Sequence, residues 1–293
     1  SATPAGASIN ASSGTIDLSA STNQDYTITY TNSGDCPTSS SVSLSIADVP
    51  TVNAISNEVF CSGSLSDEIL ISGSAGATLQ WQNTNAAIGI PASGNGTIAP
   101  YTPSVSVQEV GTITVTPSQA GCTGAPQTFT ITVNPNPTIT GPNALCFGAT
   151  LQLTGSGTAA ANNAWVSGTP ANGTVSNTGL VTGVTAGNTI ITYTNANGCT
   201  ATQTVTVNAS PTISGNTVIC PNTTSQLTGS GAPAGNNAWS SSNTGIATVS
   251  NNGLVSAVSF GTATITYTAS TGCSGTTTVN VTNPTAPTFN PIS

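Results

Sequence analysis

The chain has 293 residues, contains no lysine, arginine or histidine, and carries 8 acidic residues that give a net charge of −8. Without cations nothing can neutralise phosphate, and without histidine there is no imidazole base or ligand. The composition therefore excludes nucleic-acid binding and histidine-dependent catalysis or metal binding. All acidic residues lie within the first 109 positions, so stability has to come from burial, hydrogen bonds and covalent bridges rather than ion pairs.

The chain repeats itself, and its parts can be followed in order. Residues 1–49 are predicted to be the C-terminal part of a truncated module, because Tyr26-Thr-Ile-Thr-Tyr30 precedes Cys36 as similar runs precede later cysteines. Residues 50–136 are a divergent copy. Residues 137–210 and 211–283 align without a gap at an offset of 74, which pairs Cys146 with Cys220. Residues 284–293 are predicted to begin a further module, and we expect a stretch of a longer array.

Within each module the side chains alternate with a period of two. In Thr128–Val133, Thr262–Thr268 and Thr204–Val207, threonines face one side and apolar residues the other. This alternation predicts strands with one buried face, and Asn197-Gly198 predicts a hairpin turn between two of them. Short, evenly spaced strands with no helical stripe predict an all-β chain of tandem β-sandwiches.

Each of the three longer modules holds one tryptophan: Trp81, Trp165 and Trp239. Since the tryptophan keeps the same place in every copy, we predict that it packs in the core of an Ig-like sandwich. The alternative is an exposed platform on which a sugar ring stacks. We favour the core.

Seven cysteines at regular spacing predict disulfides and an oxidising, extracellular setting. One bridge is expected to staple each module, with the pairings Cys61–Cys122, Cys146–Cys199 and Cys220–Cys273. Cys36 is left unpaired, either because its partner lies beyond the chain or because it is a free thiol.

The acidic residues offer little chemistry. Asp67-Glu68 is the one adjacent pair, and neighbouring side chains on an extended chain point to opposite faces, so a solvated loop is expected rather than a catalytic pair. No CxxC pair and no DxD cluster exists. We predict no catalytic residue, no metal site and no cofactor, and hence no enzyme.

Three modules resemble known families. Trp239-Ser-Ser-Ser-Asn243, Ile246-Ala-Thr-Val249, Gly253-Leu-Val255 and Gly261-Thr-Ala-Thr-Ile265 resemble the signature of bacterial Ig-like group 2 domains, and residues 137–210 resemble it more loosely. Residues 50–136 resemble PKD-like domains, through Trp81-Gln-Asn83, Ile88-Gly-Ile90, Thr112–Pro117, Gly121–Gly124 and Asn134-Pro135. The mixture is similar to giant cell-surface adhesins of gliding Bacteroidota exported by the type IX secretion system.

These observations lead to a structural role. We expect a stalk segment of a large secreted adhesin that spaces and presents distal adhesive regions, in gliding motility or surface attachment. Its partners would be surface glycans or proteins bound through regions outside this chain, and the secretion or motility machinery. The alternative is a carbohydrate-binding or accessory region of a secreted hydrolase. No apolar run is long enough for a membrane span, and residues 1–10 do not resemble a signal peptide.

Overall fold

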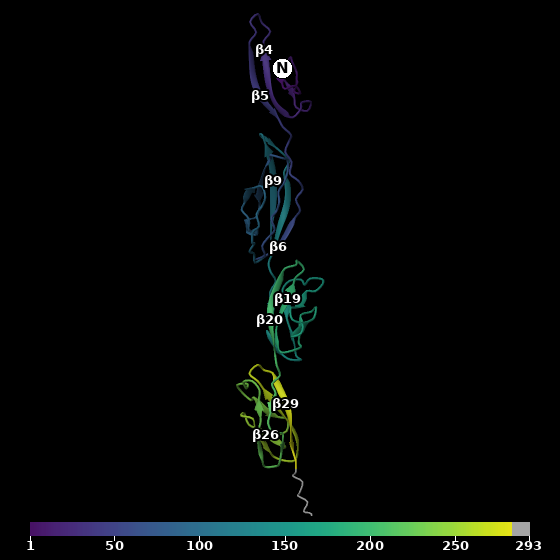
Figure 1. Cartoon of the computed structure of the whole chain (residues 1–293), viewed down its shortest axis with the longest axis vertical. Helices are drawn as coiled ribbons and strands as arrows, with labels where there is room; N and C mark the ends of the chain where they lie inside the picture. Colours follow the sequence, from purple (N-terminus) through teal and green to yellow (C-terminus); the bar gives the residue numbers. More distant parts are fainter. Residues whose placement is uncertain (283–293) are drawn as a thin grey trace, which may run out of the picture. The chain divides into compact units, whose positions relative to one another are not determined.

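The structure, a computed structural model, describes residues 1–282 (Figure 1). Within that range the regular structure is β apart from one 3₁₀ turn, η1 (Ala86–Ile88). The chain divides into two compact units between Asn136 and Pro137, and each unit is described by itself. The predicted start of a module at residues 284–293 lies outside the described residues.

The first unit opens with a small sheet in the order β1-β4-β5, formed by β1 (Ala2–Thr3), β4 (Gln24–Thr31) and β5 (Ser39–Ile46). A separate two-stranded pair joins β2 (Ser8–Ile9) and β3 (Ile16–Asp17). Tyr26 is buried, and its hydroxyl donates to the carbonyl of Thr22 at 2.7 Å. Cys36 lies in the loop between β4 and β5 and is exposed.

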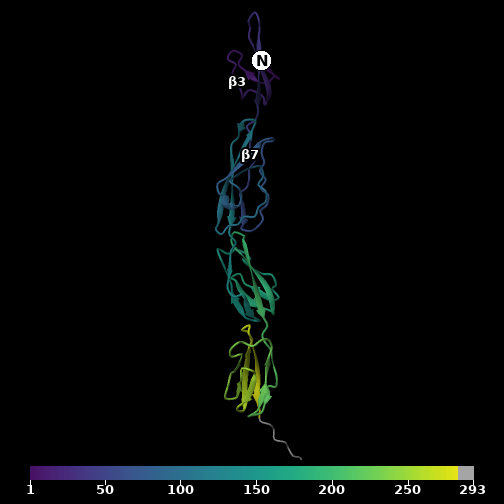
Figure 2. The same ribbon diagram turned by 90° about the vertical axis from the view of Figure 1, so that its left-hand side faces the viewer.

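The rest of the first unit is built on a sheet in the order β6-β11-β9-β7-β8. Its strands are β6 (Glu58–Cys61), β7 (Thr78–Asn83, labelled in Figure 2), β8 (Ser93–Asn95), β9 (Glu109–Gln119) and β11 (Gln127–Asn134), while β10 (Cys122–Thr123) folds back on β9. The predicted alternation is confirmed, because Phe129, Ile131 and Val133 are buried. They pack in one core with Trp81 and Ile88.

Residues 139–208 form two sheets. The larger has the order β13-β20-β19-β16, and the smaller β14-β18-β17, with a further pair β12-β15. The strands are β12 (Ile139–Thr140), β13 (Ala144–Cys146), β14 (Thr150–Gln152), β15 (Thr154–Gly155), β16 (Trp165–Ser167), β17 (Gly173–Val175), β18 (Leu180–Gly183), β19 (Gly187–Thr194) and β20 (Thr200–Asn208). The hairpin β19–β20 turns at Gly198, whose φ of 80° suits glycine, so the predicted turn is confirmed.

Residues 213–281 repeat this topology, with sheets β22-β29-β28-β25 and β23-β27-β26 and the pair β21-β24. The strands are β21 (Ile213–Ser214), β22 (Val218–Ile219), β23 (Thr224–Gln226), β24 (Thr228–Gly229), β25 (Trp239–Ser241), β26 (Ala247–Val249), β27 (Leu254–Ala257), β28 (Gly261–Thr268) and β29 (Ser274–Val281). The all-β fold predicted from the sequence is confirmed, and residues 139–208 and 213–281 each have the predicted two-sheet architecture.

The tryptophans lie in the cores, as predicted. Trp165 and Trp239 are each 7% exposed and Trp81 is 5% exposed. Trp165 packs on Tyr193 with ring centroids 4.6 Å apart, and Trp239 packs on Tyr267 at 4.7 Å. Gly229 lets the Tyr267 ring lie directly against the backbone, since a Cβ there would come within 2.4 Å of the ring. In each of these two modules a tyrosine ring thus packs on the buried tryptophan, and a glycine makes room for the tyrosine.

Candidate functional site

Three cysteines, which we call the strand cysteines, come early in the sequence of their modules but lie in space beside the end of the module's last strand: Cys61, Cys146 and Cys220. Each ends or follows a short strand that pairs in parallel with the last strand of the module. Cys61 lies opposite Asn134 and Cys146 opposite Asn208, while Ile219, just before Cys220, lies opposite Val281. Because the last strand runs toward the next module, these cysteines lie where the chain leaves.

Three further cysteines, which we call the hairpin cysteines, lie at the opposite end, in the last hairpin of each module: Cys122, Cys199 and Cys273. Cys273 immediately precedes β29. A Cβ on Gly275 would come within 1.9 Å of the Pro211 carbonyl oxygen, so this hairpin lies where the chain enters the module. Cys36 has the equivalent place in the β4–β5 hairpin.

This geometry contradicts the predicted pairings. Cys146 lies opposite the last residue of β20, whereas Cys199 precedes its first residue. A strand of this length separates their Cα atoms by about 30 Å, but a disulfide needs about 4.4–6.8 Å. The pairings Cys61–Cys122, Cys146–Cys199 and Cys220–Cys273 are therefore wrong.

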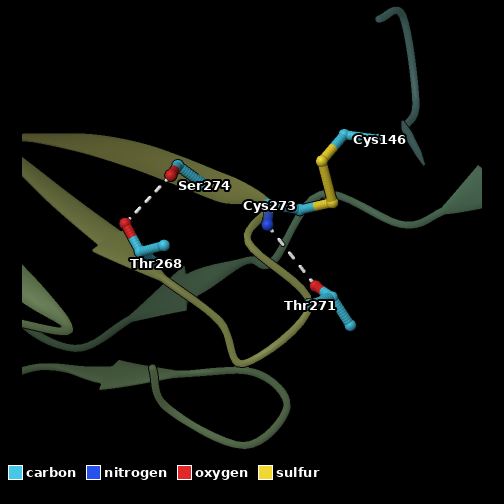
Figure 3. Close-up of a disulfide and its surroundings, with 5 residues drawn as sticks. All are labelled: Cys146, Thr268, Thr271, Cys273 and Ser274. Carbon is cyan, nitrogen blue, oxygen red and sulfur yellow. Dashed lines mark hydrogen bonds between the residues drawn. A yellow bond between two sulfur atoms is a disulfide. The ribbon is translucent and has the colours of Figure 1, made fainter. Parts of the chain in front are cut away.

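The bond that forms instead is Cys146–Cys273, which joins two consecutive modules (Figure 3). The sulfurs are 2.05 Å apart and the Cα atoms 5.6 Å apart. Cys273 is buried in a tight hairpin, where its carbonyl accepts from the Ala269 N–H at 2.9 Å and its N–H donates to Thr271 Oγ1 at 3.4 Å. A hydrogen bond of 2.9 Å between the hydroxyls of Thr268 and Ser274 closes the base of the hairpin.

Of the other five cysteines, some are disulfide-bonded and some are free. Cys61 and Cys199 are half-cystines. Among the described residues, Cys36, Cys122 and Cys220 carry free thiols. Cys36, which we predicted to be unpaired, is one of these free thiols, while the prediction that Cys122 and Cys220 are bonded is wrong. Disulfides are present as expected, but Cys146–Cys273 bridges two modules instead of stapling one.

The junction crossed by this bond is short. Only Ala209 and Ser210 separate the end of β20 from Pro211. The linker borders a small cavity of about 240 Å³, which it lines together with the neighbouring loops at Ser230–Ala232 and Ala269–Thr271. Two covalent connections, the linker and the disulfide, therefore run side by side between these modules.

In both modules a hollow lies beside the tryptophan, where a sugar ring could be expected to stack. Hollows of about 290 and 250 Å³ lie beside Trp239 and Trp165. Both tryptophans are almost fully buried, so neither offers an open ring face for stacking. In the larger hollow, Gln226 Nε2 already donates to the carbonyls of Leu227 and Asn252 at 2.8 and 2.7 Å. The hollows are consequently weak candidates for a carbohydrate site.

The carboxylates all belong to the first unit. Asp67 and Glu68 are both exposed, in keeping with the predicted solvated loop. The Ser19 hydroxyl donates to Asp17 and, with the backbone N–H groups of Ser19 and Ala20, lowers the pKa of that carboxyl. Burial raises the pKa of Tyr101. Within residues 1–282, no group of three or more Cys, Asp or Glu side chains is arranged to hold a metal ion.

The described residues contain no helix with the length and apolar character needed to cross a membrane.

Comparison with protein families supports an Ig-like fold for the last described module. Residues 201–281 match the bacterial Ig-like domain (group 2) family. The sequence has no match among curated proteins. Similar solved structures include the N-terminal eight Ig domains of Down syndrome cell adhesion molecule, with 12% identity, a TM-score of 0.38, and 88% of this chain and 39% of that chain covered.

Two further solved structures are similar to parts of the chain. Domains 4 and 5 of the S-layer protein SbsC have 22% identity and a TM-score of 0.23, with 50% of this chain and 98% of that chain covered. A C-terminal fragment of intimin, solved with a domain of its translocated receptor, has 18% identity and a TM-score of 0.28, with 59% and 58% covered. The chain spans well under half the length of the first of these three structures. The family match and the shared two-sheet topology show an Ig-like fold for residues 139–208 and 213–281.

Proposed function

We propose that this chain is a covalently braced spacer segment of an extracellular surface protein, whose task is to hold distal regions at a distance. The observation that carries the proposal is the Cys146–Cys273 bond between consecutive modules. A disulfide that only stabilised one module would lie within it. This one instead fixes the end of one module to the beginning of the next.

The bond limits bending at the junction. Two modules joined only by Ala209 and Ser210 could pivot about the rotatable bonds of those residues. A second covalent connection, from Cys146 to Cys273, removes most of that freedom because Cys146 ends a paired strand and Cys273 is held in the tight β28–β29 hairpin. The junction then behaves as a short double strut rather than a hinge.

The bond also changes the path that tension takes. When the chain is pulled at Pro137 and at the end of β29, the force passes through nine residues to Cys146, crosses the disulfide to Cys273, and continues along β29. The chain between the two cysteines, with a sequence separation of 127, is removed from the tensioned path. Both modules can consequently lose their folds under load without letting the segment lengthen by their contour length.

The setting that we propose is extracellular. A structural disulfide between modules needs an oxidising compartment, and an uncharged surface from residue 110 onward suits neither nucleic acid nor an anionic lipid surface. The finer role that we propose is a stalk in an adhesin of the gliding Bacteroidota type, exported by the type IX system. Its adhesive regions would be outside this chain, and we propose no catalytic role for it. An accessory region of a secreted hydrolase would use the same brace.

Spin labels at two equivalent exposed positions, Ile190 and Thr264, test the brace, because they report the distance between modules. Pulsed electron resonance on the oxidised full chain should give a narrow distance distribution. The distribution should broaden in the variant Cys146→Ser/Cys273→Ser and stay narrow in Cys220→Ser. Equal widths in all three would contradict a bracing role.

The surface location is tested separately by shaving intact cells with a broad-specificity protease and following this segment with an antibody. Trypsin cannot be used because the chain contains no lysine or arginine. Loss of the segment from intact cells is expected, and its survival until the cells are lysed would contradict an extracellular position.

A further inference from the structure

Cys220 occupies the place in its module that Cys146 occupies in the preceding one. The two cysteines are one repeat of 74 residues apart, and both come at the end of the short strand that pairs in parallel with the last strand of the module. Leu145 lies opposite Val207, and Ile219 opposite Val281. Cys146 and Cys220 are also alike in being half-buried. They differ in that Cys146 is bonded and Cys220 is a free thiol.

The turn that presents the cysteine is also conserved between the two modules. In both, the N–H three residues after the cysteine donates to the cysteine carbonyl, at 3.0 Å for Cys146 and 3.2 Å for Cys220. The residue two positions after it has positive φ, 76° at Gly148 and 62° at Asn222, and its N–H donates to the end of the neighbouring strand. The backbone around Cys220 therefore has the form that places Cys146 against its partner.

The bonded cysteines show what that partner is. Cys146 is bonded to the hairpin cysteine of the module that follows it. Cys61, at the equivalent place in an earlier module, is a half-cystine as well. Cys220 cannot reach the hairpin cysteine of its own module, because β29 separates the two places by about 30 Å and Cys273 is already bonded. A matching partner has to come from another module.

The surface around this end of the module suits such a contact. Val218, Val258 and Phe260 are 55%, 49% and 58% exposed. Gly261, directly after Phe260, lies opposite Val281, so these side chains are at the same end of the sheet as Cys220. No charged side chain occurs in this module, and burying this end against another module would desolvate no ion.

We propose that Cys220 is a covalent attachment site for the hairpin cysteine of a further module of the same repeat, joined after residue 282. The inference rests on the proposed function, in that it assumes modules that follow one another in an array. It makes the brace at Cys146–Cys273 one step of a series in which each module is bonded to the next.

The chemistry is a thiol–disulfide exchange. The Cys220 thiolate attacks the disulfide of a dithiol oxidoreductase, or of oxidised glutathione in vitro, and forms a mixed disulfide while releasing one thiolate. The thiolate of the incoming hairpin cysteine then attacks the Cys220 sulfur and releases the second. Two thiols of the protein lose two protons and two electrons, and the oxidant's disulfide is reduced to two thiols.

The test uses the full chain with residues 283–293 replaced by a second copy of residues 209–282, which repeats the natural linker and module. Cys36→Ser and Cys122→Ser remove the unrelated free thiols. The protein is oxidised with a glutathione buffer, denatured and alkylated, and the alkyl groups are counted by intact mass. The proposal predicts one alkylated thiol, the copy of Cys220, because Cys220 is bonded to the copy of Cys273.

Three alkylated thiols would overturn the proposal, since Cys220 and both cysteines of the copy would then be free. If Cys146 and Cys273 were alkylated too, the count would rise to five and the brace itself, and with it the proposed function, would fail. Cys220→Ser in the extended chain should give two alkylated thiols. Peptic mapping should find the bond at Cys220, and a bond elsewhere would also overturn the assignment.

Discussion

Removing the bridge between modules should destabilise the two modules that it joins. The perturbation is the double substitution Cys146→Ser/Cys273→Ser, which leaves no new free thiol. The repeat supplies a matched control, because Cys220→Ser makes the same chemical change at the equivalent position of the next module, where no bond is lost. Any effect of serine at this place in the fold is therefore present in the control.

The magnitude follows from the loop that the bond closes. For the whole span, a separation of 127 residues corresponds to about 5 kcal/mol on the chain-entropy model. If one module unfolds while its neighbour stays folded, the folded partner holds one cysteine near the linker, and the closed loop falls to about 65 residues, or about 4 kcal/mol. For a domain of this size that loss lowers the melting temperature by roughly 15–30 °C.

Differential scanning calorimetry of the oxidised proteins measures this shift. The double variant should melt far below the wild type, while Cys220→Ser should stay within a few degrees of it. Reductant should lower the melting temperature of the wild type at least to that of the oxidised double variant, since it also reduces the half-cystines Cys61 and Cys199 that the variant keeps. If the double variant melts with the Cys220→Ser control, the bond does not restrain the unfolded chain and the reasoning is refuted.

Three further predictions concern the modules themselves. Gly253→Ala should destabilise its module by about 3 kcal/mol in denaturant titrations, because the φ of Gly253 is 82° and a Cβ there would lie 2.4 Å from the Leu227 carbonyl oxygen. The control Gly272→Ala, at a glycine with the same φ but open space around it, should cost about 1 kcal/mol. Equal costs for the two variants would contradict the packing. Tyr267→Phe should cost about 1 kcal/mol through its 2.9 Å hydrogen bond to the Gly231 carbonyl, and an unchanged unfolding midpoint would count against it. The melting temperature of residues 137–282 should be the same in low and high sodium chloride and from pH 3 to pH 7, because no acidic or basic side chain follows residue 109. In the first unit the pKa of Asp17 is lowered, so this carboxylate contributes stability above its unfolded pKa, and that stability is lost as the pH falls through the folded pKa. If acid melted both units together, this difference between them would be refuted.

The sequence was sufficient to predict the strands and the core. Alternation along Thr262–Thr268 identified Ala263, Ile265 and Tyr267 as buried, and all three are. The place of Trp239 between two cysteines predicted a core residue, and it is one. These features depend on local pattern and on burial, which one copy of the repeat already displays.

The cysteine pairing could not be predicted in the same way. Two cysteines on either side of a tryptophan look like a core bridge when the module is considered alone. What decides the pairing is the parallel contact of β13 with β20, which places Cys146 beside Asn208 at the far end of the sheet from Cys199. Parallel pairing between segments about 60 residues apart leaves no local sequence signal. One feature of the sequence did point to bonds between modules: Cys36 has no partner cysteine within residues 1–49, as expected if a hairpin cysteine pairs with a cysteine of another module. Cys146 and Cys273, which do pair, belong to consecutive copies of the repeat.

Single-molecule stretching tests the central claim most directly, with handles attached at positions 138 and 282 of the full chain. In the oxidised protein the bond should keep a stretch with a sequence separation of 127 out of the tensioned path. Reduction, or Cys146→Ser/Cys273→Ser, should therefore add about 430 Å of contour length on full extension. If the oxidised chain extends as far as the reduced one, the bond does not carry tension between the modules, and the bracing account is contradicted.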